Sequence, residues 1–187
     1  MSQPGSTFRA ALVGSIPNLR AFAISLTGDH HRANDLVQET MLKAWTNREK
    51  FEAETNFKAW LFTILRNTYF SEIRKRRREV QDVDGQAAAQ LVSPPEQHGH
   101  LDLAEFRKAL SSLSEDQREA LLLIGAEGFS YEEAAAISGC AVGTVKSRVN
   151  RARARLAELM SLGSADDLGP ELASRGVITR SPQSGLG

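Results

Sequence analysis

The chain has 187 residues and a formal net charge of zero, with 23 Lys and Arg against 23 Asp and Glu. This length allows one or two small domains, and a hydrophobic content of 41% is sufficient for compact cores. No run of about 18 apolar residues occurs and the N-terminus has no signal-peptide pattern, so neither a membrane helix nor secretion is expected. A single cysteine, Cys140, agrees with a reducing cytoplasm.

Residues 8–79 are predicted to form a small helical bundle. Apolar residues recur every three or four positions from Leu12 to Leu26, which indicates a first helix that Gly28 ends. Asp29 is expected to cap the second helix. The third helix follows a polar loop over residues 47–56 and runs into a cluster of five cations, Arg74–Arg78. The apolar stripe of the second helix contains Ala33, Leu36, Val37, Met41 or Thr40, Ala44 and Trp45.

The second half of the chain begins after a break in the helical pattern. Residues 80–100 have no sustained period and contain Pro94 and Pro95, so they are predicted to form a flexible linker. Helical periodicity returns over residues 101–160, where Ser114 is expected to cap a helix. Residues 161–187 are rich in Gly, Ser and Pro and are predicted to be a disordered tail. The fold class is therefore all-α, with two small helical domains joined by a linker.

The most informative part of the second domain is a helix, a glycine turn and a basic helix. Ser130–Glu133 has the sequence of a capping box, and Gly139 is expected to end the helix that it begins. The following stretch Gly143–Leu156 contains five basic residues and no acid. This order is typical of a helix-turn-helix whose second helix enters the major groove of DNA. Cys140 in the turn is expected to be a small packing residue rather than a redox sensor.

The faces of the basic helix follow from a rotation of about 100° per residue. Its apolar stripe, which must face the core, consists of Val145, Val149, Ala152 and Leu156. The opposite face carries Gly143, Ser147, Asn150, Arg151 and Ala154, and cations lie on both margins. Serine, asparagine and arginine at the centre of such a face suit base edges, whereas cations at its margins suit phosphates.

No constellation for catalysis or cofactor binding is found. There is no glycine-rich phosphate loop, and no nucleophile and base stand at a characteristic spacing. The histidine pairs His30–His31 and His98–His100 have no cysteine or carboxylate at ligand spacing, so no metal site is predicted. An enzyme is therefore not expected, and no cofactor is implied.

Together these segments resemble a bacterial sigma factor of the extracytoplasmic-function class, which has helical regions 2 and 4 joined by a linker. The resemblance covers residues 8–160 and is carried by Asp35–Trp45, Phe57–Asn67 and Gly143–Arg148. Two further segments, Phe70–Val80 and Gly125–Ala134, resemble the general-stress subgroup of alphaproteobacteria, called EcfG-type. The resemblance implies region 2 at residues 8–79, a linker at 80–100 and region 4 at 101–160.

The resemblance also implies partners and contact residues. Core RNA polymerase is expected to bind through the clamp helices of its largest subunit and its flap. The polymerase contacts expected in this chain are Asp35, Gln38, Glu39 and Lys43. In the subgroup, a small helical anti-sigma factor of the NepR type restrains the sigma factor until a phosphorylated decoy regulator captures it.

Promoter DNA is the other implied partner, and each region reads one element. Contacts to the minus-ten element are expected from Arg66, Asn67, Arg74, Lys75, Arg76, Arg77 and Arg78. For the minus-thirty-five element, the expected base readers are Ser147, Asn150 and Arg151, with Lys146 beside them. The expected phosphate contacts are Thr144, Arg148 and Arg153. Phe57 and Trp60 fit the apolar stripe and are expected in the core rather than as stacking platforms.

Two other functions remain open from the sequence. A sigma-like decoy that captures an anti-sigma factor would share the helical plan, but it needs a receiver domain of roughly 120 further residues that the tail does not supply. A stand-alone helix-turn-helix regulator would leave Asp35–Trp45 and the Arg74–Arg78 cluster unexplained.

Overall fold

The computed structural model describes residues 4–52, 56–82 and 101–160, and these residues form helices and short connections without a strand. The first four α-helices are α1 (Pro4–Gly14), α2 (Ile16–Thr27), α3 (His30–Thr46) and α4 (Phe57–Asp82), with a 3-10 turn at Arg48–Lys50. The others are α5 (Leu101–Ser111), α6 (Glu115–Gly125), α7 (Tyr131–Ser138) and α8 (Val142–Leu159). The all-α prediction is confirmed for the described residues. The predicted tail and the linker from residue 83 onward lie outside them.

The first half packs α2, α3 and α4 around a common core. Leu19, Phe22, Leu36, Leu61 and Leu65 are almost completely buried there. The boundary between α2 and α3 forms as predicted. Gly28 has a left-handed φ of 68°, and the Asp29 carboxylate accepts hydrogen bonds from two backbone amides of the first turn of α3, at 2.7 and 3.0 Å.

The first predicted helix is interrupted. The helix is interrupted at Ser15, which separates α1 from α2. Pro17 lies in the first turn of α2. Proline has no amide hydrogen, and its ring collides with the carbonyl four residues earlier, here that of Val13. Thr7–Thr27 also has the length and apolar composition of a membrane-spanning helix, contrary to the expectation from apolar runs. In the structure Leu12 and the apolar face of α2 are instead buried in the protein core.

The second half is a compact helical unit in which α8 packs on α5, α6 and α7. Two reciprocal capping boxes start α6 and α7, one between Ser114 and Gln117 and one between Ser130 and Glu133. Gly139 ends α7 with a left-handed φ of 63°. The predicted inward stripe of the basic helix is confirmed, because its four residues are almost completely inaccessible: Val145, Val149, Ala152 and Leu156.

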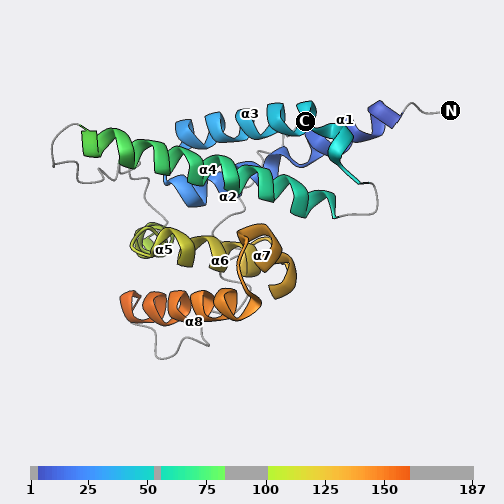
Figure 1. The fold of residues 1–187 in the computed structure, drawn as a ribbon. Coiled ribbons are helices and arrows are strands. Elements are labelled where there is room, and N and C mark those ends of the chain that lie inside the picture. Colours follow the sequence, from blue (N-terminus) through green and yellow to red (C-terminus); the bar gives the residue numbers. More distant parts are fainter. Residues whose placement is uncertain (1–3, 53–55, 83–100, 161–187) are drawn as a thin grey trace, which may run out of the picture.

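The two halves pack against each other in two layers, with α1–α4 above α5–α8 in Figure 1. The contacts between layers are made mainly by α4 against α7 and by α2 against α6. The rings of Phe62 in α4 and Phe129 before α7 meet edge to face, with centroids 5.2 Å apart. The basic helix α8 lies on the far side of the lower layer from α4 (Figure 1).

Candidate nucleic-acid interface

The outward face of α8 is open to solvent. Asn150 and Arg151 are exposed and lie opposite the buried stripe of the same helix, and Lys146 is exposed on the margin beside them. The Lys146 ammonium lies 5.5 Å from the centre of the Tyr131 ring at the start of α7, which steadies the long side chain beside the outward face. An exposed asparagine and arginine at the centre of a helix can each form paired hydrogen bonds with a base edge.

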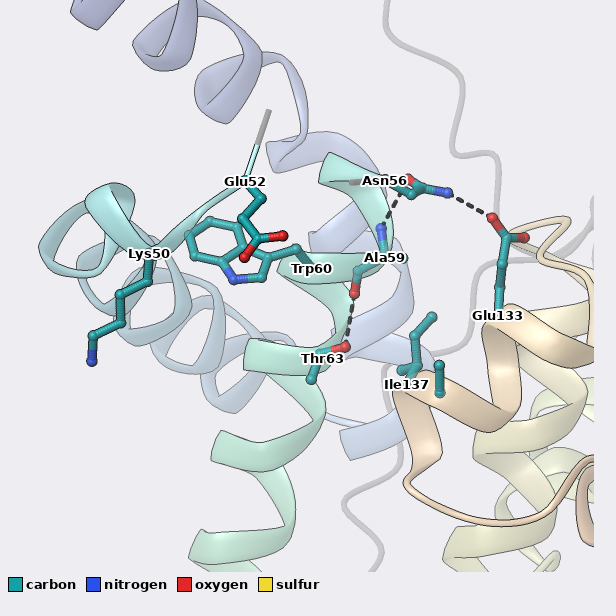
Figure 2. A pocket seen from close by; sticks show the side chains of 9 residues that line it. Lys50, Glu52, Asn56, Ala59, Trp60, Thr63, Glu133 and Ile137 are labelled. Carbon is teal, nitrogen blue, oxygen red and sulfur yellow. Dashed lines mark hydrogen bonds between the residues drawn. The ribbon is translucent and has the colours of Figure 1, made fainter. Parts of the chain in front are cut away.

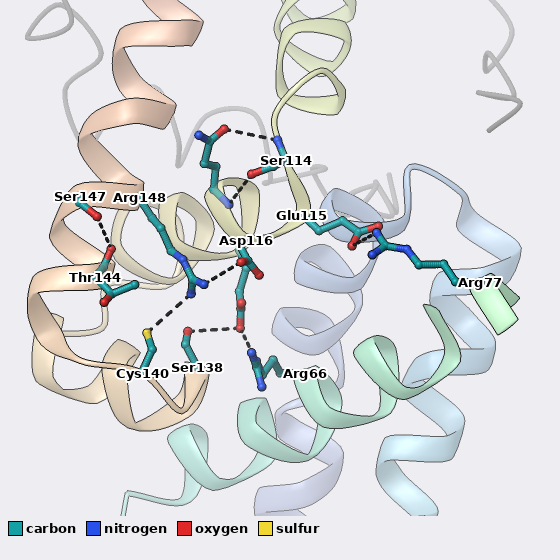
Figure 3. Close-up of polar contacts among 12 residues, drawn as sticks. Arg66, Arg77, Ser114, Glu115, Asp116, Ser138, Cys140, Thr144, Ser147 and Arg148 are labelled. Atoms are coloured by element: carbon teal, nitrogen blue, oxygen red, sulfur yellow. Dashed lines mark hydrogen bonds and ion pairs between the residues drawn. The ribbon is translucent and has the colours of Figure 1, made fainter. Parts of the chain in front are cut away.

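Several polar side chains of α8 have protein partners that the sequence did not indicate. Arg148 forms an ion pair of 2.6 Å with Asp116 in the first turn of α6, and it also donates to the Cys140 sulfur at 3.6 Å (Figure 3). The Ser147 hydroxyl donates to the Thr144 carbonyl at 2.9 Å. Arg153 is half-buried, and its Nε has no hydrogen-bond partner among the described residues. The roles predicted for these side chains remain predictions, but the structure gives Arg148 a structural partner.

The cation cluster of α4 forms an exposed surface near the end of that helix. All five residues Arg74–Arg78 are exposed, as is Asn67 two turns earlier. Two of the five are paired with acids: Lys75 with Glu79 at 3.9 Å and Arg77 with Glu115 of α6 at 3.0 Å. Exposed pairs of this kind are weak and exchange readily, so the cluster can still bind phosphates.

Arg66 is half-buried and points into the second half of the chain. Its Nε donates to Glu119 Oε1 at 2.9 Å. Its guanidinium also lies 4.6 Å from the centre of the Phe70 ring. Glu119 also accepts from the Ser138 hydroxyl at 3.3 Å. Burial raises the pKa of the Glu119 carboxyl, and the neighbouring Arg66 acts in the opposite direction.

A third surface lies on the outward side of α3. The predicted residues Asp35, Gln38, Glu39 and Lys43 are exposed there. Lys43 bridges Glu39 at 2.7 Å and the Thr68 hydroxyl of α4 at 3.0 Å. The same side carries two apolar residues, Leu42 and Trp45, which are 68% and 43% exposed. The prediction that Trp45 belongs to the buried stripe is therefore wrong, because Trp45 lies about 100° round the helix from the fully buried Ala44.

An aromatic cluster surrounds Phe51, which directly follows the 3-10 turn after α3. Phe51 packs on Phe57 at 5.1 Å and on Trp60 at 5.3 Å, and Phe8 of α1 closes the group. Phe57 and Trp60 are packed against the core, as expected. Among the described residues no group of histidines, cysteines and carboxylates could hold a metal ion. His98 and His100 lie outside those residues.

Comparison with known proteins identifies both halves. Residues 13–79 match the family model Sigma-70 region 2, and residues 103–156 match Sigma-70, region 4. The chain belongs to the sigma-70 family of RNA polymerase sigma factors. It is 57% identical to the ECF RNA polymerase sigma factor EcfG of Rhodopseudomonas palustris over 92% of this chain and 95% of that protein. It is therefore a sigma factor of the extracytoplasmic-function group, and the sequence-based assignment is confirmed.

Two solved structures show the same arrangement of helices. The sigma factor RpoE from Bartonella quintana, in complex with the anti-sigma factor NepR, has 57% identity and a TM-score of 0.77, over 84% of this chain and 99% of that one. CnrH, in complex with the cytosolic domain of CnrY, has 28% identity and a TM-score of 0.62, over 86% and 91% of the two chains. Sigma factors are transcription initiation factors. The matched ranges place α3 and α4 in region 2, and α8 as the second helix of the region 4 helix-turn-helix.

A cavity of about 300 Å³ lies where region 2 meets region 4 (Figure 2). Region 2 contributes Lys50, Asn56 and Trp60 to its lining, and region 4 contributes Glu133 and Ile137. Asn56 Nδ2 donates to Glu133 Oε1 at 2.7 Å across it, and Asn56 Oδ1 accepts from the Ala59 amide as the cap of α4. Sequence analysis missed this site, since no local pattern links residues that are 77 positions apart.

Proposed function

We propose that this chain binds core RNA polymerase and directs it to promoters with a minus-ten and a minus-thirty-five element, as its family membership implies. The observation that carries the proposal is the exposed outward face of α8, on which Asn150 and Arg151 lie opposite a fully buried stripe. Base readout requires such a face, because phosphate contacts alone carry no sequence information.

The other surfaces support a division of labour within the chain. The α3 surface, with Gln38, Glu39 and the exposed Leu42, binds polymerase. The Arg74–Arg78 cluster and Asn67 bind the minus-ten strand, where cations follow the backbone of melted DNA. Neither region needs high affinity alone, because polymerase holds both near their elements and raises their effective concentration.

The proposed regulation follows from the similarity to two of these relatives. Because the chain is 57% identical to EcfG and to the RpoE that was crystallised with NepR, we propose that it serves the general stress response. A small anti-sigma factor of the NepR type restrains it. The protein acts in the cytoplasm and has no catalytic activity of its own. The match to region 2 over residues 13–79 disfavours a stand-alone helix-turn-helix regulator.

Transcription in vitro tests the proposal. Core polymerase and a template with both promoter elements are expected to give a defined transcript only when this protein is added. Scrambling either element should abolish that transcript, and a NepR-type protein should suppress it. If a known sigma factor directs transcription with the same core polymerase and this chain does not, the proposed function is wrong.

A further inference from the structure

The arginines on the α6 side of α8 differ in how they are paired. Arg148 and Arg155 lie on that margin and Arg151 lies beside them on the outward face, all within about 60° of one another round the helix. Arg148 pairs with Asp116 of α6 at 2.6 Å, and Arg155 pairs with Glu158 of α8 itself at 2.6 Å. Arg151 forms no ion pair with any residue that the structure describes. Of the three cations, Arg151 is thus the one that can bind DNA without first leaving a carboxylate.

The pair between Arg148 and Asp116 is more protected than the exposed pairs of α4. The Arg148 side chain is 21% exposed, whereas Lys75 and Arg77 are 78% and 71% exposed. The Arg148 guanidinium also donates to the Cys140 sulfur, so it is held both by α6 and by the turn before α8 (Figure 3). Ion pairs that are shielded from solvent are screened less by salt than exposed pairs. Arg148 therefore stays on Asp116 under conditions in which the cations of α4 exchange partners.

Asp116 has a fixed position that does not depend on DNA. It lies in the first turn of α6, directly after the cap that Ser114 and Gln117 form. A carboxylate at this place is stabilised by the partial positive charge of the helix N-terminus. Arg148 must leave this fixed acceptor to reach a phosphate, and the Asp116 carboxylate that remains would repel the phosphate.

We infer that Asp116 limits the affinity of region 4 for DNA, because it holds Arg148 away from the phosphates. The inference rests on the proposed function and makes Asp116 a positioning residue of the minus-thirty-five surface. The wild type then lacks the phosphate contact predicted for Arg148, while Asn150 and Arg151 still read bases. Phosphate contacts carry no sequence information, so the limit applies to every DNA sequence alike. The chain binds DNA weakly until polymerase brings region 4 to a promoter and raises its effective concentration there.

Salt titrations of DNA binding by the free full chain test the inference. The probes are two labelled duplexes of equal length, one with the minus-thirty-five element and one in which that element is scrambled. Asp116→Asn frees Arg148 for one phosphate, so the plot of log affinity against log salt should become steeper by about 0.9 on both duplexes. The gain in affinity over the wild type should therefore shrink about 3.5-fold between about 50 and 200 mM salt. Asp116→Ala removes the acceptor as well as the charge and should give the same steeper slope.

Arg148→Gln shows whether Arg148 is the cation concerned. In the wild-type background this substitution should leave the slope unchanged, and Asp116→Asn should have no effect when Arg148→Gln is also present. The matched control Glu132→Gln removes an equal charge from an exposed position in the first turn of α7 and should leave the slope unchanged. Circular dichroism of each variant checks that it is folded.

Three results would overturn the inference. The first is an equal slope for the wild type, Asp116→Asn and Asp116→Ala. The second is a slope that is shallower by about 0.9 in Arg148→Gln alone, because Arg148 then binds a phosphate although Asp116 is present. The third is a gain from Asp116→Asn that persists with Arg148→Gln or that Glu132→Gln reproduces, since either would be a general effect of charge.

Transcription by the wild-type chain with core polymerase is scored separately. Absence of promoter-specific transcription refutes the proposed function. Promoter-specific transcription together with parallel salt slopes refutes only the limit that Asp116 sets.

Discussion

Arg118 connects three parts of the molecule through backbone carbonyls. From α6, its guanidinium donates to the carbonyls of Leu110, Ser111 and Leu113 around the end of α5, at 3.0, 2.7 and 3.1 Å. It also donates to the carbonyl of Leu26 at the end of α2, at 2.8 Å. One side chain thus closes the turn between α5 and α6 and ties region 4 to region 2.

Arg118→Met tests how much these contacts contribute to the free energy of unfolding, because methionine keeps an apolar stem and has no hydrogen-bond donor. Hydrogen bonds from a charged group contribute about 1.5–3 kcal/mol each, but they are not additive and solvent can replace some of them. Burial lowers the pKa of Arg118, so its charge is also held at a desolvation cost that the variant recovers. We expect a net loss of about 2–4 kcal/mol.

Urea unfolding followed by circular dichroism measures this loss as a lower midpoint. Arg155→Met is the control, because Arg155 is exposed and, within the part of the chain that the structure describes, pairs only with Glu158 one turn away, at 2.6 Å. The control should stay within about 0.5 kcal/mol of the wild type. If Arg118→Met is no more destabilised than Arg155→Met, the carbonyl contacts do not stabilise the fold and the reasoning fails.

Three further predictions concern the proposed surfaces and the buried acid. Arg151→Ala should weaken the free energy of binding to the preferred minus-thirty-five sequence by about 1–3 kcal/mol, and the loss should be smaller on DNA in which the base pair that Arg151 reads is changed. A uniform loss of binding over all DNA variants would make Arg151 a phosphate contact. Leu42→Arg should weaken binding to core polymerase by more than about 1 kcal/mol. The control Val13→Arg changes a comparably exposed position on α1 and should not weaken binding. Equal losses for the two variants in a pull-down titration would refute a specific α3 surface. The pKa of Glu119 is raised above its usual 4.5, so the folded protein keeps this proton to higher pH than the unfolded chain does. The unfolding free energy of the wild type relative to Glu119→Gln should therefore fall as pH rises from 4.5 through the raised pKa, and a difference that is flat in pH would contradict this.

Sequence patterns predicted the features that depend on neighbouring residues. The Asp29 cap, the Ser130 capping box and the Gly139 helix end are each made by residues within a few positions of one another, and all formed as expected. The buried stripe of α8 was likewise predictable, because a period of 3.6 residues determines which side chains share a face. The outward face of α8 follows from that stripe by geometry alone.

The remaining features depend on where one helix lies against another. How far a residue beside a stripe is covered depends on the neighbouring helices: Trp45, about 100° round α3 from the fully buried Ala44, was predicted in the stripe and is exposed. The same limit applies to Arg66 and Glu119, which are 53 positions apart and meet only because α4 packs on region 4. The family resemblance implied Arg66 as a DNA contact, which stays a prediction, and no local pattern identifies its carboxylate partner.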